Sequence, residues 1–333
     1  MNVSDGLFTR AGFVALLFAV IPAALHFSGS GYAFRVVDTV LIFAILAVSM
    51  NLITGVAGLL SIGHAAFYGV GAYAAALAST KLGWPLWLTL PFSGLCAALL
   101  GVAVALPTMR LVSIYFAVAT LGIGQMIYVT LLNWVDFTGG PLGIRGIPRP
   151  SLFGLDLSGP VGTYMVCAVV CAFAVWVVHR CTHGYFGNAL RALREDDQCA
   201  EAMGLDIVRL KIQVFAIACF LAGLAGGLWS HTTGFISPAD FAFPVSILIL
   251  ASVVVGGLGS LPGALIGAAL LILLPEVLRF VGDIRQIAVG VVMFLSILFL
   301  PKGIFGEVSA LDFARRQLGA AWQAPDGTRT GWR

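Results

Sequence analysis

The stretch His179–Lys211 reads HRCTHGYFGNALRALREDDQCAEAMGLDIVRLK and separates two long apolar runs, VGTYMVCAVVCAFAVWVV at Val161–Val178 and IQVFAIACFLAGLAGGLWSHTTG at Ile212–Gly234. The whole chain is 60% hydrophobic and only 10% charged, with a mean hydropathy of +1.01. Soluble domains carry about 25% charged residues on average. The composition therefore predicts a polytopic membrane protein in which His179–Lys211 is the one substantial polar loop.

Apolar runs long enough to cross a membrane recur along the chain. A membrane helix needs about 20 mainly apolar residues. The runs are continuous and do not alternate, which favours helices over barrel strands. We therefore expect an all-α bundle of about ten transmembrane or re-entrant helices in a single membrane domain over residues 1–333. The predicted spans are Ala11–Ser28, Val36–Ile53, Leu59–Ser79, Pro85–Leu106, Leu111–Leu132, Val161–Val178, Ile212–Gly234, Phe241–Val255, Gly263–Val281 and Ile284–Leu300. Leu59–Ser79 and Phe241–Val255 are short or glycine-rich, so they are candidates for re-entrant or broken helices.

The basic residues predict the orientation in the membrane, because Lys and Arg near span ends favour the cytoplasm. With ten spans, these residues share one side: Arg10, Arg110, Arg180, Arg209, Lys211, Lys302, Arg315 and Arg316. Both termini, the loop 179–211 and the polar tail 302–333 are then cytoplasmic. The Gly- and Pro-rich segment Asn133–Pro160 falls outside and is expected to be irregular.

Several classes of function find no support in the residues. The net charge of +3 is small and gives no reason to expect nucleic acid. Cys167 and Cys171 share a helix face, but no His or carboxylate joins them, so we expect apolar packing and no metal site.

Motifs for energy conversion and catalysis are also missing from the sequence. No lysine stands in a G-x-x-x-x-G-K-[ST] loop, and H-E-x-x-H and G-x-S-x-G do not occur. Ionisable residues deep in the spans are nearly absent, although ion-driven pumps need them. Asp38, Glu276 and Arg279 lie near span ends, where we expect them to snorkel or pair. The sequence thus predicts a membrane protein that forms a passage for a solute, without a cofactor, an enzymatic activity or an energy source of its own.

The polar loop is predicted to contain a short helix that docks on a partner protein. Asn188 is the expected N-cap, Arg191 and Glu195 are spaced i,i+4, and Gly204 suits the C-terminal stop. Leu190, Leu193, Asp197, Ala200 and Met203 share one stripe. The basic and acidic residues of Arg180–Lys211 cancel, which argues against simple attachment to anionic lipid and favours a groove on a partner. The alternative is a solvated connector.

A second group of polar residues predicts a translocation path. Asn51, Ser61, His64, Tyr68 and Tyr73 surround a glycine-rich segment that includes Gly63 and Gly71. Glycines permit broken backbone or close helix approach, and broken helices line substrate paths in many transporters. The alternative is that these small residues only pack helices and that His64 bonds a neighbouring carbonyl group.

Two further glycine patterns bear on the architecture. Gly58–Ile62 (GLLSI) and Gly257–Leu261 (GLGSL) each lead into a helix of small residues, which suggests an internal repeat. The spaced pairs Gly223/Gly227 and Gly263/Gly267 predict helix–helix contacts, within the chain or to a second permease.

Four segments together resemble the LivM-type permeases of branched-chain amino acid ABC transporters. They are GLLSIGHAAFYGVGAYAAAL at Gly58–Leu77, the glycine-rich segment Asn133–Pro148, the loop Arg191–Gly204 leading to Lys211 and Phe215, and AGLAGG at Ala222–Gly227. The resemblance covers roughly Val40 to Pro301. The usual importer pattern of Glu-Ala-Ala followed four residues on by Gly is not kept, because Ala200, Glu201 and Ala202 precede Gly204 too closely.

The resemblance implies a permease subunit of an ABC importer in the bacterial inner membrane, translocating branched-chain or related amino acids. Its partners would be a second permease, expected as a heterodimer, two cytoplasmic ATP-binding subunits and a periplasmic solute-binding protein. The ATPase-coupling residues would be Asn188, Arg191, Leu193, Arg194, Glu195, Ala200, Glu201 and Gly204. The path residues would be Asn51, Ser61, Gly63, His64, Tyr68 and Gly71.

Three alternatives stay open at this point. The same family includes urea and amide permeases, so the solute is not determined. An ion-coupled secondary carrier would need a buried ionisable relay. A membrane-embedded enzyme would need clustered polar side chains, for which His179 and His183 are the nearest pair, without a third ligand nearby in the sequence.

Overall fold

The computed structural model describes residues 31–108, 113–152, 155–278, 290–291 and 294. Most of them are helical. The helices are α2 (Gly31–Met50), η1 (Asn51–Val56), α3 (His64–Lys81), α4 (Leu86–Thr108), α5 (Ser113–Asn133), α6 (Val135–Thr138), η2 (Gly140–Leu142), α7 (Pro160–Thr182), α8 (Tyr185–Glu195), α9 (Asp197–Ala202), α10 (Ile207–Thr233), η3 (Pro238–Phe241), α11 (Phe243–Gly256) and α12 (Leu261–Val277). The strands are β1 (Ile144–Arg145), β2 (Ser151–Leu152), β3 (Leu155–Asp156) and β4 (Phe235–Ile236).

The described residues form a bundle of membrane helices, as predicted. Six segments are long and apolar enough to span: Gly31–Val56, Leu86–Thr108, Tyr115–Asn133, Pro160–Thr182, Ile207–Thr233 and Pro238–Gly256. The expected count of about ten is not confirmed. The predicted span Leu59–Ser79 is a loop followed by the 18-residue α3, and α12 is a shorter apolar helix. The predicted spans Ala11–Ser28 and Ile284–Leu300 lie outside the described residues, apart from isolated positions in the second.

Helix α10 lies at the centre of the bundle, where it packs against α2, α3 and α4. Glycines bring these helices close. A Cβ on Gly71 would lie 2.4 Å from the Cα of Gly223, and a Cβ on Gly226 would lie 2.1 Å from the carbonyl oxygen of Tyr68. Such approach needs residues without side chains, because any Cβ would force the backbones apart.

The paired glycines contact neighbouring helices of the same chain, as predicted. Gly227 faces α4, since its Cβ would meet Ser93 Oγ at 2.5 Å. Gly263 and Gly267 of α12 face α11, where their Cβ atoms would meet the carbonyl oxygens of Gly256 and Ser252 at 2.5 and 2.0 Å. Helices α7 and α12 pack on α2, which completes the bundle around the central helices.

Two helix breaks interrupt this packing. The first is residues 57–63, between η1 and α3, and it follows a π-helical turn that ends α2. The second is residues 257–260, between α11 and α12. Gly58, Gly257 and Gly259 have φ angles of 71°, 120° and 84°, a region that favours glycine because it has no Cβ. The echoing segments Gly58–Ile62 and Gly257–Leu261 thus both lie at breaks.

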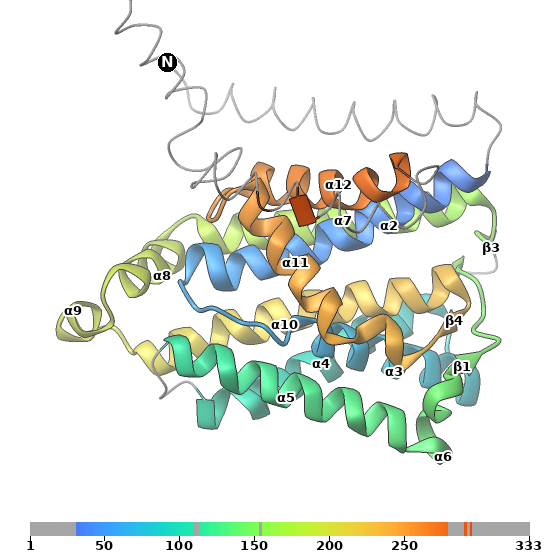
Figure 1. Ribbon diagram of the computed structural model, residues 1–333, viewed down its shortest axis with the longest axis horizontal. Coiled ribbons are helices and arrows are strands. Elements are labelled where there is room, and N and C mark those ends of the chain that lie inside the picture. Colours follow the sequence, from blue (N-terminus) through green and yellow to red (C-terminus); the bar gives the residue numbers. More distant parts are fainter. Residues whose placement is uncertain (1–30, 109–112, 153–154, 279–289, 292–293, 295–333) are drawn as a thin grey trace, which may run out of the picture.

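The two ends of the bundle differ. Helices α8 and α9 project from one end, and the short strands β1, β3 and β4 lie at the other, which we call the strand end (Figure 1). The strand end contains most of Asn133–Pro160, which is irregular as predicted. Its β1 pairs with β4 in antiparallel register, with Ile144 opposite Ile236. The bundle therefore carries its polar loop and its glycine-rich segment on opposite ends.

Candidate functional site

The predicted docking helix is present as α8, although it begins earlier than expected. Gly184, with a φ of 91°, is the N-cap, so the prediction that Asn188 caps the helix was wrong. Asn188 lies within the helix, where its Oδ1 accepts a hydrogen bond of 3.2 Å from Arg191 Nη1. Leu190 and Leu193 are buried and fasten α8 to the bundle. The amphipathic pattern, rather than the N-cap, determines which face of α8 packs against the bundle.

The polar loop forms two helices, not one. Helix α8 ends at Glu195, and Asp196 turns into extended backbone and caps α9. Its Oδ1 accepts hydrogen bonds from the N–H groups of Gln198 and Cys199 at 2.8 and 3.0 Å. These donors hold the pKa of the Asp196 carboxyl below its ordinary value, Cys199 contributing most. The sequence signal that was missed is the pair Asp196-Asp197, because aspartate is a preferred N-cap.

The outer surface of α8 and α9 combines charge with exposed apolar side chains. Tyr185 is 80% and Met203 is 85% exposed. Arg191, Glu195 and Glu201 are exposed as well. Ala200 is buried, and Gly204, with a φ of 85°, ends the turn after α9 as predicted. Lys211 Nζ lies 2.5 Å from Asp197 Oδ2 and ties α9 to α10. The inner side of α8 and α9 is therefore anchored to the bundle, while Tyr185 and Met203 on the outer side are exposed.

Arg194 joins α8 to both helix breaks. Its Nη1 donates a hydrogen bond of 2.7 Å to the carbonyl oxygen of Gly55. A Cβ on Gly58 would lie 2.9 Å from Arg194 Cγ, and a Cβ on Gly259 would lie 3.4 Å from Arg194 Nη1. The arginine thus touches the end of η1, the first break and the second break. Sequence spacing cannot reveal this contact, because 139 residues separate Arg194 from Gly55.

Asn51 connects the two breaks to each other. Its Oδ1 accepts a hydrogen bond of 2.8 Å from the N–H group of Gly259, and its Nδ2 donates one of 3.3 Å to the carbonyl oxygen of Ser260. The side chain is fully buried. A buried amide that satisfies two backbone groups holds them in one arrangement, because breaking either bond would leave a buried polar group without a partner.

The other polar path candidates line the first break and the start of α3. His64 is fully buried, and its Nε2 lies 2.8 Å from Ser49 Oγ, so its partner is a hydroxyl group and not a carbonyl group. The Oγ of Ser61 and the Nδ1 of His64 find no hydrogen-bond partner among the described residues. Gly63 packs on α5, since its Cβ would lie 2.1 Å from the carbonyl oxygen of Thr120. The first break and the start of α3 therefore hold two buried polar atoms, Ser61 Oγ and His64 Nδ1, that can each form a further hydrogen bond.

Tyr68 and Gly71 lie about one and two helical turns after His64 on α3. The Tyr68 ring packs edge-on against Phe241, with 4.9 Å between ring centroids. Gly71 faces α10. A small void of about 10 Å³ lies beside the break, near Gly63 and Tyr128. All six predicted path residues are buried within the helix packing.

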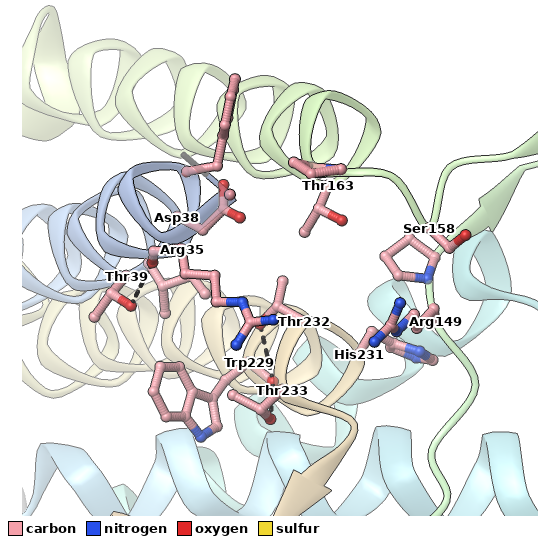
Figure 2. Close-up of a pocket in the computed structure, with 15 residues that line it drawn as sticks. Arg35, Asp38, Thr39, Arg149, Ser158, Thr163, Trp229, His231, Thr232 and Thr233 are labelled. Atoms are coloured by element: carbon pink, nitrogen blue, oxygen red, sulfur yellow. Dashed lines mark hydrogen bonds between the residues drawn. The ribbon is translucent and has the colours of Figure 1, made fainter. Parts of the chain in front are cut away.

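A cavity at the strand end was missed at the sequence level. It lies between α2, α7, α10 and the segment before α7, and it measures about 500 Å³ (Figure 2). Asp38 lines it and is only 6% exposed, so of the two expectations for Asp38, to snorkel or to pair, the first was wrong, and no ion pair to Asp38 occurs among the described residues. The sequence feature that could have indicated this cavity is Asp38 itself, a carboxylate one helical turn after Arg35 in an otherwise apolar helix.

The fold and these contacts define a class of protein. It is a multi-pass α-helical membrane protein whose discontinuous helices meet inside the bundle, the arrangement in which transporters place their substrate paths. Among the described residues, no cluster of three or more His, Cys, Asp or Glu side chains could hold a metal ion.

Comparison with known proteins identifies the family. The profile described as "Branched-chain amino acid transport system / permease component" matches residues 32–300, and the chain belongs to this family. It is 34% identical over 314 residues to the high-affinity branched-chain amino acid transport system permease protein LivM of Escherichia coli K12, covering 87% of this chain and 73% of that protein.

Two further relatives show the breadth of the similarity. LivM of Salmonella typhimurium is 32% identical over 323 residues, covering 90% of this chain and 76% of the relative. The permease LivH of Escherichia coli K12 is 26% identical over 289 residues, covering 80% of this chain and 91% of the relative. The relatives are thus transport permeases of two related kinds.

Proposed function

We propose that this chain is a permease subunit of an ABC importer that moves branched-chain or closely related amino acids across the bacterial inner membrane. ATP hydrolysis in partner subunits drives the transport, and this chain carries no catalytic or cofactor chemistry of its own. Family membership supports the importer role, and the names of the LivM and LivH relatives support the solute.

The observation that carries the proposal is the hydrogen bond from Arg194 to Gly55. An importer without its own ATPase needs a rigid element that links a cytoplasmic partner to the helices of the path. Helix α8 is amphipathic, is anchored by Leu190 and Leu193, and touches both helix breaks through Arg194. A rigid-body push on α8 is therefore transmitted to the breaks.

Two sets of residues divide the work. The coupling residues, which dock on the ATP-binding subunit or hold the docking helices, are Asn188, Arg191, Leu193, Arg194, Glu195, Ala200, Glu201 and Gly204. The path residues, which move or face the solute when the breaks rearrange, are Asn51, Ser61, Gly63, His64, Tyr68 and Gly71. The closed packing of the second set fits a state in which the path is shut.

The proposed complex contains two permeases, two ATP-binding subunits and a periplasmic solute-binding protein. The similarity of this chain to both LivM and LivH favours a heterodimer of related permeases. Tyr185 and Met203 supply exposed apolar anchors, and the charged residues around them set the register of docking on the ATPase. The polar loop 179–211, the tail 302–333 and both termini face the cytoplasm, and the strand end faces the periplasm.

Reconstitution of the importer tests the function. The five components are placed in proteoliposomes with ATP on the cytoplasmic side, and uptake of radiolabelled leucine, isoleucine and valine is measured. We expect uptake that requires both ATP and this chain, with unlabelled urea failing to compete. Uphill uptake by this chain alone, driven by a proton or sodium gradient, would support a secondary carrier and overturn the proposal.

A further inference from the structure

The cavity at the strand end has the build of a ligand site. Its volume of about 500 Å³ lies within the range of small-molecule pockets, roughly 300–1,000 Å³. Helices α2, α7 and α10 form its walls, and Arg149 and Ser158 close it from the segment that precedes α7 (Figure 2). Its lining residues belong to the start of α2, the start of α7 and the end of α10, which lie at the end of the bundle opposite α8 and α9, so the cavity is separate from the coupling surface.

Asp38 places a buried carboxyl group in the wall of this cavity. The residue is 6% exposed, and its Oδ1 finds no hydrogen-bond partner among the described residues. A buried carboxylate is costly unless a cation or hydrogen-bond donors compensate it. A ligand with an ammonium group would supply both the charge and the donors that this oxygen lacks.

Two guanidinium groups line the same cavity. Arg35 lies one helical turn before Asp38 on α2, and Arg149 comes from the segment before α7. Both side chains are exposed, and neither has a carboxylate of the described residues within ion-pair distance. Guanidinium groups bind carboxylates through paired N–H donors, which makes arginine the preferred residue for that group.

The backbone that carries Arg149 is held in place by His231. The Nδ1 of His231 donates a hydrogen bond of 2.8 Å to the carbonyl oxygen of Pro148, and its Nε2 lies 2.9 Å from Thr89 Oγ1. The first bond sets the tautomer, because a carbonyl oxygen only accepts. Helices α4 and α10 thereby position the residue next to Arg149, and Figure 2 shows Arg149 beside His231.

Apolar side chains complete the lining. Phe34 and Ile42 of α2 and Trp229 of α10 face the cavity, and Nε1 of Trp229 also lacks a partner among the described residues. Hydroxyl groups of Thr163 and Thr232 lie around them. The cavity thus combines one buried anionic group, two cationic groups and an apolar wall.

We propose that this cavity binds the zwitterionic head group of an amino acid before it crosses the membrane. The ammonium group lies against Asp38, the carboxylate against Arg35 and Arg149, and the aliphatic side chain against Phe34, Ile42 and Trp229. The inference rests on the proposed import function and adds an amino acid subsite inside the permease. Selection for a zwitterion then occurs in the permease itself as well as in the protein that delivers the solute.

Other ligands fit the charges less well. A simple carboxylate would face the buried Asp38, and a simple amine would face two arginines. A neutral amide such as urea would leave all three charges without a counterpart. A divalent metal ion needs several oxygen ligands around it, whereas Asp38 is the only carboxylate among the described residues that line the cavity.

Equilibrium binding tests the inference directly. The probe is radiolabelled leucine, bound to the detergent-purified complex of both permeases and both ATPases without the solute-binding protein. Unlabelled leucine, 4-methylpentanoate, isopentylamine and leucinamide compete for binding. We expect leucine to displace the probe at concentrations at least about tenfold lower than each analogue, because each analogue loses a charged hydrogen-bonding partner. Equal displacement by the analogues would overturn the subsite.

Variants locate the binding to the cavity. We expect Asp38→Asn, and the double variant Arg35→Gln with Arg149→Gln, to weaken leucine binding about tenfold or more. Asp136→Asn and Arg145→Gln are matched controls, because both residues are exposed at the strand end and neither lines the cavity. If Asp38→Asn does not reach the membrane, Asp38→Glu keeps the charge and is expected to restore insertion with altered affinity.

The two proposals fail in different ways. If the wild-type importer takes up no branched-chain amino acid, the proposed function fails. If the wild-type importer takes up leucine while the cavity variants bind and transport it like the controls, only the subsite fails.

Discussion

Arg194 Nη1 lies 2.7 Å from the carbonyl oxygen of Gly55 and so fastens α8 to the end of the π-helical turn η1. The contact joins the polar loop to the one place where α2 leaves regular α-helical geometry. Turns of π-helix often occur at functional sites, because a carbonyl group is freed from the normal i to i−4 pattern. The aliphatic part of Arg194 lies against Gly58 and its guanidinium lies next to Gly259, so α8 contacts both breaks through this one residue.

Replacement of Arg194 is expected to separate ATP hydrolysis from transport. Arg194→Ala removes the bond to Gly55 while leaving the exposed surface of α8 largely intact. We expect uptake to fall about tenfold, equivalent to the loss of about 1.4 kcal/mol of coupling, while ATPase binding persists. Uptake and ATPase pull-down in the reconstituted complex measure the two effects.

Arg209→Ala is the matched control, because Arg209 lies in the same polar loop, is exposed, pairs with Asp206 three residues before it, and belongs to neither the coupling set nor the path set. Charge reversal, Arg191→Glu, is expected to weaken ATPase binding instead. Normal uptake by the Arg194→Ala variant would contradict the coupling role of that residue.

Asn51 is expected to hold the two breaks together. Asn51→Ala leaves the N–H group of Gly259 without its buried acceptor, which costs about 1–3 kcal/mol. The midpoint of thermal unfolding in detergent should drop, and uptake should fall with it. Asn133→Ala is the control, because Asn133 is exposed and its side chain, among the described residues, bonds only to the Val129 carbonyl oxygen one turn away. Equal midpoints for the two variants would show that Asn51 contributes no such link.

Gly71 is expected to tolerate no side chain. In Gly71→Ala the new Cβ would lie 2.4 Å from the Cα of Gly223, so α3 and α10 must separate. Overpacking of this kind costs about 1–3 kcal/mol. Gly122→Ala is the control, because a Cβ on Gly122 meets nothing within 4 Å, and it should be neutral or stabilise the helix by up to about 1 kcal/mol. Thermal unfolding of both variants checks the prediction. A loss of stability confined to Gly122→Ala would refute it.

Asp196 is expected to keep α9 ordered over a wide pH range. Its pKa is lowered in the folded chain by the N–H groups of Cys199 and Gln198, so its capping contribution is complete above the ordinary carboxyl pKa. That contribution is lost only as the pH falls through the lower, folded-state pKa.

Amide hydrogen exchange over Asp197–Ala202 measures this order. Asp196→Ala should speed exchange at neutral pH, whereas the control Glu195→Ala removes a charge of the same sign without removing the cap. Similar exchange in both variants would mean that the cap does not order α9.

Much of the architecture could be predicted from the sequence. Long apolar runs without alternation favour helices, in which the backbone groups bond within their own segment, and six of the predicted spans appear among the described residues. The polar loop, its amphipathic helix and the turn at Gly204 followed from periodicity and glycine chemistry. The cap at Asn188 was wrong because a positive-φ glycine, Gly184, starts the helix a turn earlier.

The candidate site was less predictable. Asn51 was identified as a polar residue beside a glycine-rich segment, but its partners Gly259 and Ser260 are more than 200 residues away. Arg194 was assigned to docking from its place on a charged loop, whereas its guanidinium faces inward to Gly55. Asp38 was expected to snorkel or pair because it lies near a span end, yet packing of α2 against α7 buries it beside a cavity.

Local chemistry determined the class of fold, the polar loop and the family of this chain, since hydropathy, charge and glycine spacing act over a few turns of one helix. Only the tertiary structure decided that the two breaks meet, that Arg194 joins them to α8, and that Asp38, Arg35 and Arg149 line one cavity. Those relationships join residues far apart in the chain, and their geometry is set by how glycine-faced helices pack, which no single segment encodes.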